Sequence, residues 1–481
     1  MERFGACTVD GFASLGWRGW NTLKDSIPTA AIKAVQRNHL LILSPDRSAL
    51  LVKMHANLGY LLPTVVTAVE RKVLPQVKDY LDQIGISIES IISLASRDSS
   101  PEGCFDTAVL VQTQPCSSPG SELEWKMIPE LLKTQALWDV QRDFLCDYAG
   151  IATSICTPTS PRFIGYPGWT ADLRDWAGAA AMKAGFGAIK GFMPLRASRV
   201  EAVVVFQTET DRSVYVKCFA PLPFTEALVT RALGERYPER VAKTLDFCDE
   251  RGWWATEEVA GPSLAEHLTL ADCLAAMGRF SQMQKELTGC QAIFAEMGLR
   301  QLRLREIGRE IDGALAELDQ VSDLSLSELS NLSSQLSKAS AGLAELDFPE
   351  SLIHTDLTPW NVKLSGRGAV FLDWEGAAWG PAILSVEVFL AALRSPHGQL
   401  RDSDWLERIR SFYLQSFGPT DPRWEDRHIR RYSRALALFC QLKEFLRCGR
   451  DEPDVLRGRA CVVEAARKLH RLLVLTPIKD S

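Results

Sequence analysis

Short apolar runs separated by polar turns mark the first part of the chain. The runs at residues 40–43, 49–52 and 108–111 have the length of strands, whereas apolar positions in residues 70–84 recur at helical spacing. This alternation predicts a domain that contains both strands and helices.

The second half of the chain follows a helical pattern. Its apolar residues recur at the spacing of amphipathic helices. The predicted helices are at residues 268–287, 291–297, 305–318, 328–346, 385–394, 404–417, 424–447 and 453–473. We therefore expect a large helical region, and a short helix at residues 171–184 precedes it.

A β-hairpin is predicted between these two regions. Its strands are residues 203–206 and 213–217, and a polar turn at residues 209–212 joins them. Because side chains alternate along a strand, Lys217 is predicted on the face opposite Val214 and Val216, where its ammonium group can reach a phosphate.

The polar loop at residues 354–361 reads His-Thr-Asp-Leu-Thr-Pro-Trp-Asn, and Asp-Trp-Glu follows at residues 373–375. Asp356 can accept a hydrogen bond from a substrate hydroxyl and orient it for in-line attack. Asn361 and Asp373 offer a neutral and a charged oxygen to magnesium. With Lys217 as the cation on the phosphates, these are the parts that phosphoryl transfer from a nucleotide requires.

These motifs, in this order, resemble the aminoglycoside phosphotransferase and choline kinase family, whose loop reads His-Gly-Asp-x-x-x-x-Asn with a later Asp-Trp/Phe-Glu. The resemblance implies an α+β, bilobal protein-kinase-like fold with a small β-rich lobe at residues 185–262 and a large helical lobe at residues 263–481. It also implies transfer of the γ-phosphate of ATP or GTP to a hydroxyl group of a small-molecule acceptor.

The resemblance assigns a role to several residues. Lys217 would contact the α- and β-phosphates, Glu226 would orient Lys217, Asp356 would be the catalytic base, and Asn361 and Asp373 would bind Mg²⁺.

The nucleotide would have further contacts. Ser198 would lie in the loop that covers the phosphates, and backbone groups of Glu257 and Val259 would bond the adenine. Gly261 would allow a turn between the lobes. Arg196, close to Ser198, is either a phosphate ligand or a solvated surface charge.

The chain departs from the family pattern at two places. Thr355 stands where the family has glycine, and residues 380–385 lack the acidic residue that relatives often carry. His354 is expected to brace the loop rather than to bind a metal. Glu375 is either a structural hydrogen-bond acceptor or a third metal ligand.

Residues 1–150 resemble a Nudix hydrolase domain, an α/β domain whose signature aligns with Thr64, Glu70 and residues 78–86. Only Glu70, Gly85 and Ile86 match it strictly. Shorter carboxylates at Asp79 and Asp82, and a strained helix at Pro75, favour a degenerate domain without catalysis. An unrelated domain of strands and helices is the alternative.

Composition agrees with an enzyme of several domains. A chain of 481 residues exceeds one ordinary core, and we place a linker and helix at residues 151–184 between the Nudix-like domain and the kinase-like lobes. The net charge of −6 gives no support for a nucleic acid or membrane partner. The start of the chain is not a charged-then-apolar leader, and the cysteines are scattered, so we expect a cytoplasmic protein with reduced thiols.

Three functions therefore stay open: a small-molecule kinase, a Nudix-type nucleoside diphosphate hydrolase, and a nucleotide-binding regulator without catalysis. Intact residues at Lys217, Asp356, Asn361 and Asp373 favour the kinase. The sequence does not identify the acceptor.

Overall fold

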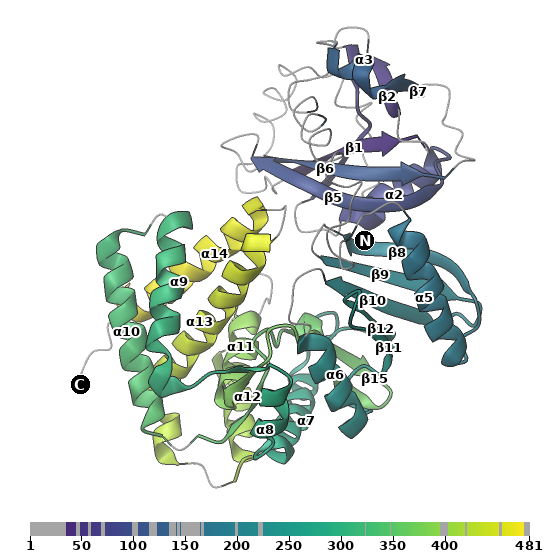
Figure 1. Cartoon of the computed structure of the whole chain (residues 1–481). Coiled ribbons are helices and arrows are strands. Elements are labelled where there is room, and N and C mark those ends of the chain that lie inside the picture. The colour runs from purple at the N-terminus through teal and green to yellow at the C-terminus, as the bar shows by residue number, and fades with distance from the viewer. Residues whose placement is uncertain are drawn as a thin grey trace. The chain divides into compact units, whose positions relative to one another are not determined.

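The protein is represented by a computed structural model that describes residues 35–44, 49–55, 59–68, 73–98, 104–114, 123–133, 141, 145, 164, 168–197, 201–219, 225–322, 324–346, 348–394, 403–418, 421–451 and 455–475. The chain divides into two compact units (Figure 1). Unit 1 comprises Met1–Leu222, Leu245–Thr256 and Glu452–Leu456. Unit 2 comprises Pro223–Thr244, Glu257–Asp451 and Arg457–Ser481.

Unit 1 begins with a seven-stranded sheet of order β3-β2-β1-β6-β5, in which β4 also pairs with β1 and β7 with β2. Its elements are β1 (Val35–Leu43), β2 (Ala49–His55), β3 (Gly59–Leu61), β4 (Thr64–Ala68), α2 (Val73–Gln83), β5 (Ile88–Asp98), β6 (Cys104–Thr113), β7 (Leu123–Met127) and α3 (Ile128–Lys133). Strands β1 and β6 are parallel. The strands predicted at residues 40–43, 49–52 and 108–111 are confirmed.

The expectation that Pro75 strains the helix is wrong. Helix α2 begins at Val73, so Pro75 is its third residue. The first N–H groups of a helix have no intrahelical acceptor, so proline in the first turn removes no helical hydrogen bond. Glu70, which the Nudix resemblance uses, lies outside the described residues, and the resemblance of this domain stays a prediction.

A second sheet of unit 1 has five strands in the order β11-β12-β10-β9-β8. Its elements are α5 (Trp169–Lys183), β8 (Ile189–Ala197), β9 (Glu201–Thr208), β10 (Ser213–Phe219), β11 (Thr244–Cys248) and β12 (Trp253–Glu257). Strands β9 and β10 form the predicted hairpin, with Lys217 opposite Val203. Val214 and Val216 are fully buried, whereas Lys217 is half-buried, as the alternation predicts.

The two sheets of unit 1 contribute to one hydrophobic core. Helix α2 lies against β8, and α5 packs against β8, β9 and β10. Leu173, Ala177 and Ala181 of α5 recur at the spacing of one helical face, and all three are fully buried. The domain boundaries expected near residues 150, 184 and 262 stay predictions.

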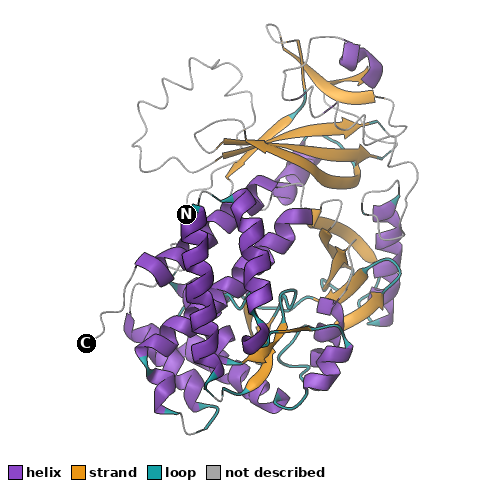
Figure 2. Cartoon of the chain, turned by 60° about the vertical axis from the view of Figure 1, so that its left-hand side comes forward, coloured by secondary structure: helices purple, strands orange, loops and turns teal. Residues whose placement is uncertain are grey.

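Unit 2 is mainly helical (Figure 2). Its helices are α6 (Thr225–Arg236), α7 (Leu270–Leu287), α8 (Gln291–Glu296), η3 (Leu304–Glu306), α9 (Gly308–Val321), α10 (Leu326–Ala344), η4 (Pro359–Asn361), α11 (Ile383–Leu393), α12 (Ser403–Gln415), η5 (Pro422–Glu425), α13 (Arg427–Asp451), α14 (Val455–His470) and η6 (Arg471–Leu475). Ser325 begins α10 with a capping box, because its side chain accepts from the N–H of Glu328 and the Glu328 side chain accepts in return.

Short strands of unit 2 carry the loops with the predicted site residues. They are β13 (Arg300–Gln301), β14 (Glu350–Ile353), β15 (Val362–Ser365), β16 (Gly368–Phe371) and β17 (Ala378–Pro381). Strand β14 ends directly before His354, and the antiparallel pair β15–β16 separates the two loops. The α+β fold class is confirmed.

Within the described part of the chain, every helix is too short or too polar to cross a membrane.

Candidate active site

The loop after β14 brings Asp356 and Asn361 together. The Nδ2 group of Asn361 donates to Oδ2 of Asp356 and to the backbone oxygen of Asp356, both at 2.9 Å. The loop closes because Thr358 N–H donates to Asp356 C=O and Asn361 N–H donates to Thr358 C=O. With its amide nitrogen turned to Asp356, Asn361 has its Oδ1 oxygen as a ligand atom for a cation.

The carboxyl group of Asp356 has a strongly raised pKa. Burial is the largest cause and the charge of Asp373 is the next, and together they raise the pKa of Asp356 to about 7. The charges of Glu375 and Glu444 act in the same direction, whereas the hydrogen bond from Asn361 opposes them. A carboxylate that is costly to ionise in this way is suited to take up a proton from a hydroxyl group.

His354 braces the loop, as expected. Its Nε2 lies 2.9 Å from the carbonyl oxygen of Leu372, and its Nδ1 accepts from the N–H of Asp356 at 3.3 Å. These two contacts assign the Nε2–H tautomer, because a carbonyl oxygen only accepts. The ring is fully buried and lies 4.7 Å from that of Trp374.

Trp374 anchors the second loop. Its side chain is 1% exposed and stacks with Phe280 at 6.2 Å between ring centroids. Asp373 precedes it with a φ of 65°, in the left-handed region that aspartate tolerates better than most residues. The buried indole thus fixes both carboxylates that flank it, Asp373 and Glu375.

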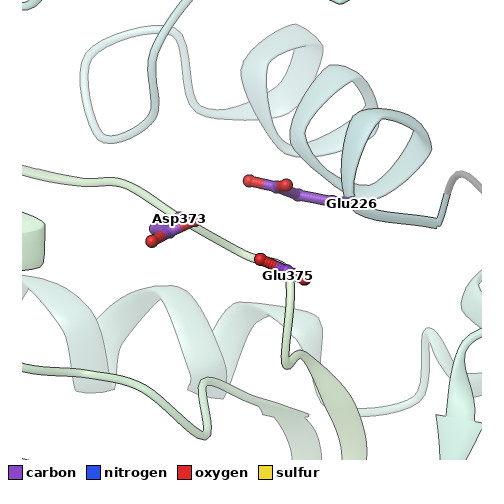
Figure 3. A group of neighbouring side chains, drawn as sticks. All are labelled: Glu226, Asp373 and Glu375. Atoms are coloured by element: carbon purple, nitrogen blue, oxygen red, sulfur yellow. The ribbon is translucent and has the colours of Figure 1, made fainter. Parts of the chain in front are cut away.

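Glu226 faces these two carboxylates. It extends from α6 towards the loop that carries Asp373 and Glu375 (Figure 3), and one oxygen of each residue lies within 4.8 Å of the others. Opposite ligands of an octahedral Mg²⁺ are about 4.2 Å apart, given bonds of about 2.1 Å. The three carboxylates therefore fit a divalent cation after a small adjustment, and Glu375 is available as a third ligand.

The remaining phosphate-binding candidates belong to unit 1. Lys217 lies on β10, with its Nζ 5.8 Å from the ring centroid of Trp254. Because Glu226 belongs to unit 2, its pairing with Lys217 stays a prediction. Arg196 forms an ion pair with Glu201 at 2.9 Å. Ser198 lies outside the described residues, so its role also stays a prediction.

The segment predicted to hold adenine follows β12. The N–H of Glu257 donates to Lys243 C=O at 2.9 Å, so the carbonyl of Glu257 is the group to be considered for a nucleotide contact. Val259 is half-buried. Gly261 has a φ of 110°, and a Cβ there would lie 2.1 Å from the carbonyl oxygen of Leu364. Glycine is thus required at this turn.

Two residues near the site were missed in the sequence. Ser385 lies in the segment that lacks the expected acidic residue, and its Oγ accepts from the N–H of His354 at 3.0 Å. Glu444 of α13 raises the pKa of Asp356 through its charge. Ser385 interrupts an otherwise apolar helical run, which was the available signal for a buried polar contact.

Solved structures with a similar fold include three kinases of antibiotics. An amicoumacin kinase is 14% identical, with 64% of this chain and 97% of that chain covered and a TM-score of 0.44. A macrolide 2′-phosphotransferase from Brachybacterium faecium is 14% identical, with 64% and 100% covered and a TM-score of 0.42. A spectinomycin phosphotransferase is 13% identical, with 63% and 98% covered and a TM-score of 0.43.

No curated protein sequence matches the chain. Residues 195–436, however, match the family described as APH, the phosphotransferase enzyme family. This span is half of the chain and contains Lys217, Glu226, Glu257, Val259, Asp356, Asn361 and Asp373. The chain therefore belongs to the phosphotransferase enzyme family.

Proposed function

We propose that this phosphotransferase moves the γ-phosphoryl group of ATP or GTP to a hydroxyl group of a small molecule, with Asp356 as the catalytic base and Mg²⁺ on Asn361 and Asp373. One observation carries the proposal. The buried carboxyl group of Asp356 has a pKa raised to about 7, and it lies beside one proposed metal ligand and within the field of the other.

Asp356 would accept the hydrogen bond of the acceptor hydroxyl and hold its oxygen in line with the γ-phosphorus. As the new oxygen–phosphorus bond forms, the hydroxyl proton passes to Asp356, and the nucleoside diphosphate leaves. The hydrogen bond from Asn361 keeps the carboxyl group of Asp356 in one orientation throughout. His354 and Ser385 fix the backbone on both sides of this residue.

Mg²⁺, when bound, would neutralise charge on the phosphate oxygens. Asn361 Oδ1 and the Asp373 carboxylate would hold it, and Glu226 and Glu375 are close enough to contribute. Lys217 would contact the α- and β-phosphates, and Ser198 would lie in the loop over them. The Glu257 carbonyl and the Val259 N–H would bond the adenine. A cytoplasmic location agrees with this choice of donor and stays a prediction.

The test is Mg²⁺-dependent turnover of ATP and of GTP in the presence of hydroxylated amines, sugars and amino-acid derivatives. We expect at least one acceptor to stimulate turnover and to gain a phosphate, which mass spectrometry detects. Lys217→Met should raise the KM for the nucleotide more than it changes the KM for the acceptor. Tight binding of AMP-PNP with no phosphorylated acceptor would favour a regulator without catalysis.

A further inference from the structure

Thr355 occupies the position between His354 and Asp356 where the resembling family has glycine. Its side chain is buried, with 2% exposure, and its Oγ1 donates to the carbonyl oxygen of Gly376 at 2.5 Å. Gly376 lies three residues after Asp373, so this hydrogen bond joins the loop of the proposed base to the loop of the proposed metal ligand.

Gly376 has no side chain that could interfere with Thr355. A Cβ at residue 376 would lie 2.2 Å from Thr355 Oγ1 and 3.1 Å from Cγ of Glu444. Gly376 is not among the glycines with a positive φ, so its backbone conformation does not require glycine. The neighbouring threonine requires it instead, because two heavy atoms cannot approach to 2.2 Å.

The segment from Leu372 to Gly376 is held at both of its ends by the loop of Asp356. At its first end, the N–H of Leu372 donates to Asn361 C=O, and the carbonyl oxygen of Leu372 contacts His354 Nε2, both at 2.9 Å. Thr355 supplies the contact at the second end. Between these ends lies Asp373, whose φ of 65° is a conformation that an unsupported chain rarely adopts.

We propose that Thr355 and Gly376 are a matched pair that positions the Asp373 loop against Asp356, so that Thr355 is a positioning residue of the phosphotransferase site. This inference rests on the proposed function. Thr355 does not touch a reacting atom. It acts through the backbone of Gly376, and a displacement of about 1 Å at a reacting group can lower the rate about 100-fold.

Four variants of the full chain separate this role from simple packing. Thr355→Val keeps the shape but removes the donor, and Thr355→Ser keeps the donor. Gly376→Ala introduces the clash, and the double variant Thr355→Ala, Gly376→Ala relieves it. The probe is Mg²⁺-dependent ATP hydrolysis with water as the acceptor, and thermal unfolding is followed in parallel.

Thr355→Val should lower kcat about 10- to 100-fold with the KM for ATP changed less than about threefold, and Thr355→Ser should stay within about threefold of wild type. Gly376→Ala should lose more activity than the double variant. A wild-type kcat in Thr355→Val, with only its melting temperature lowered, would reduce Thr355 to a packing residue and overturn the inference.

A failure of the proposed function is recognised separately. In that case the wild type hydrolyses no ATP, and the pair is read from urea unfolding of the same variants. Gly376→Ala should then destabilise the protein less in the Thr355→Ala background than in the wild type. Equal destabilisation in both backgrounds would show that the two residues are not coupled, and would contradict the matched pair.

Discussion

Asn361 donates its side-chain amide to both the carboxylate and the backbone oxygen of Asp356, each at 2.9 Å. One side chain thus orients the proposed base and, with its other atom, offers a ligand to a cation. The base and the metal site are therefore coupled through a single residue, and a change at Asn361 should affect both.

Asn361→Ala should weaken the binding of Mg²⁺ in the presence of AMP-PNP about 10- to 100-fold, because a ligand and the group that orients Asp356 are lost together. Isothermal titration calorimetry measures the affinity. Asn331→Ala, which removes an exposed asparagine of α10, is the matched control and should bind like wild type. Unchanged Mg²⁺ affinity in Asn361→Ala would rule out the proposed ligand.

The raised pKa of Asp356 predicts a pH-dependent cost to stability. Because its pKa in the folded, metal-free protein is about 7, above its usual value of 3.8, the folded state binds more protons than the unfolded state between these values. Ionisation of Asp356 therefore destabilises the fold as the pH rises through 7.

Asp356→Asn should accordingly be more stable than wild type at pH 8, by about 1 to 4 kcal/mol, since one pKa unit corresponds to about 1.4 kcal/mol. The difference should shrink as the pH falls from 7 towards 4. Urea unfolding of the metal-free proteins in chelator measures it. A variant that is less stable than wild type at pH 8 would contradict the assigned pKa.

The positive φ of Asp373 separates its backbone role from its charge. Asp373→Asn should fold with nearly wild-type stability, because asparagine tolerates the left-handed region, whereas Asp373→Val should lose about 1–2 kcal/mol. Both variants should lose stabilisation by Mg²⁺ with AMP-PNP. Thermal unfolding with and without these ligands checks both parts, and equal stability of the two variants without ligand would argue against the left-handed conformation.

Arg410 forms a buried ion pair that holds the helices behind the site. Its Nε donates to Glu387 Oε1 at 2.8 Å, and both side chains are 3% exposed. Arg410→Ala should destabilise unit 2 by about 3–5 kcal/mol, because it leaves the carboxylate of Glu387 buried without this partner. Arg408→Ala on the same helix removes an exposed arginine and should cost less than about 1 kcal/mol. Similar costs for both, measured by urea unfolding, would contradict the burial of Glu387.

The parts of the site that depend on local spacing could be predicted from the sequence. Asp356 and Asn361 lie in one short loop, and alternation along β10 placed Lys217 opposite the buried valines. The helices of unit 2 followed from apolar periodicity alone.

Contacts between distant segments could not be predicted in the same way. Ser385 lies 31 residues from His354, and only the packing of α11 beside β14 brings its hydroxyl to the loop. The Thr355–Gly376 contact likewise depends on two loops that meet in space. The misjudged effect of Pro75 has a local cause, because the pattern did not reveal that the helix starts at Val73.

The central claim is that Asp356 serves as the base of phosphoryl transfer, and single-turnover transfer from γ-labelled ATP by Asp356→Asn tests it most directly. Asp404→Asn, which alters an exposed aspartate, is the control, and AMP-PNP binding is measured for each protein. We predict that transfer by Asp356→Asn falls about 100- to 10,000-fold while AMP-PNP binding is kept. Transfer at the wild-type rate in Asp356→Asn would contradict the mechanism.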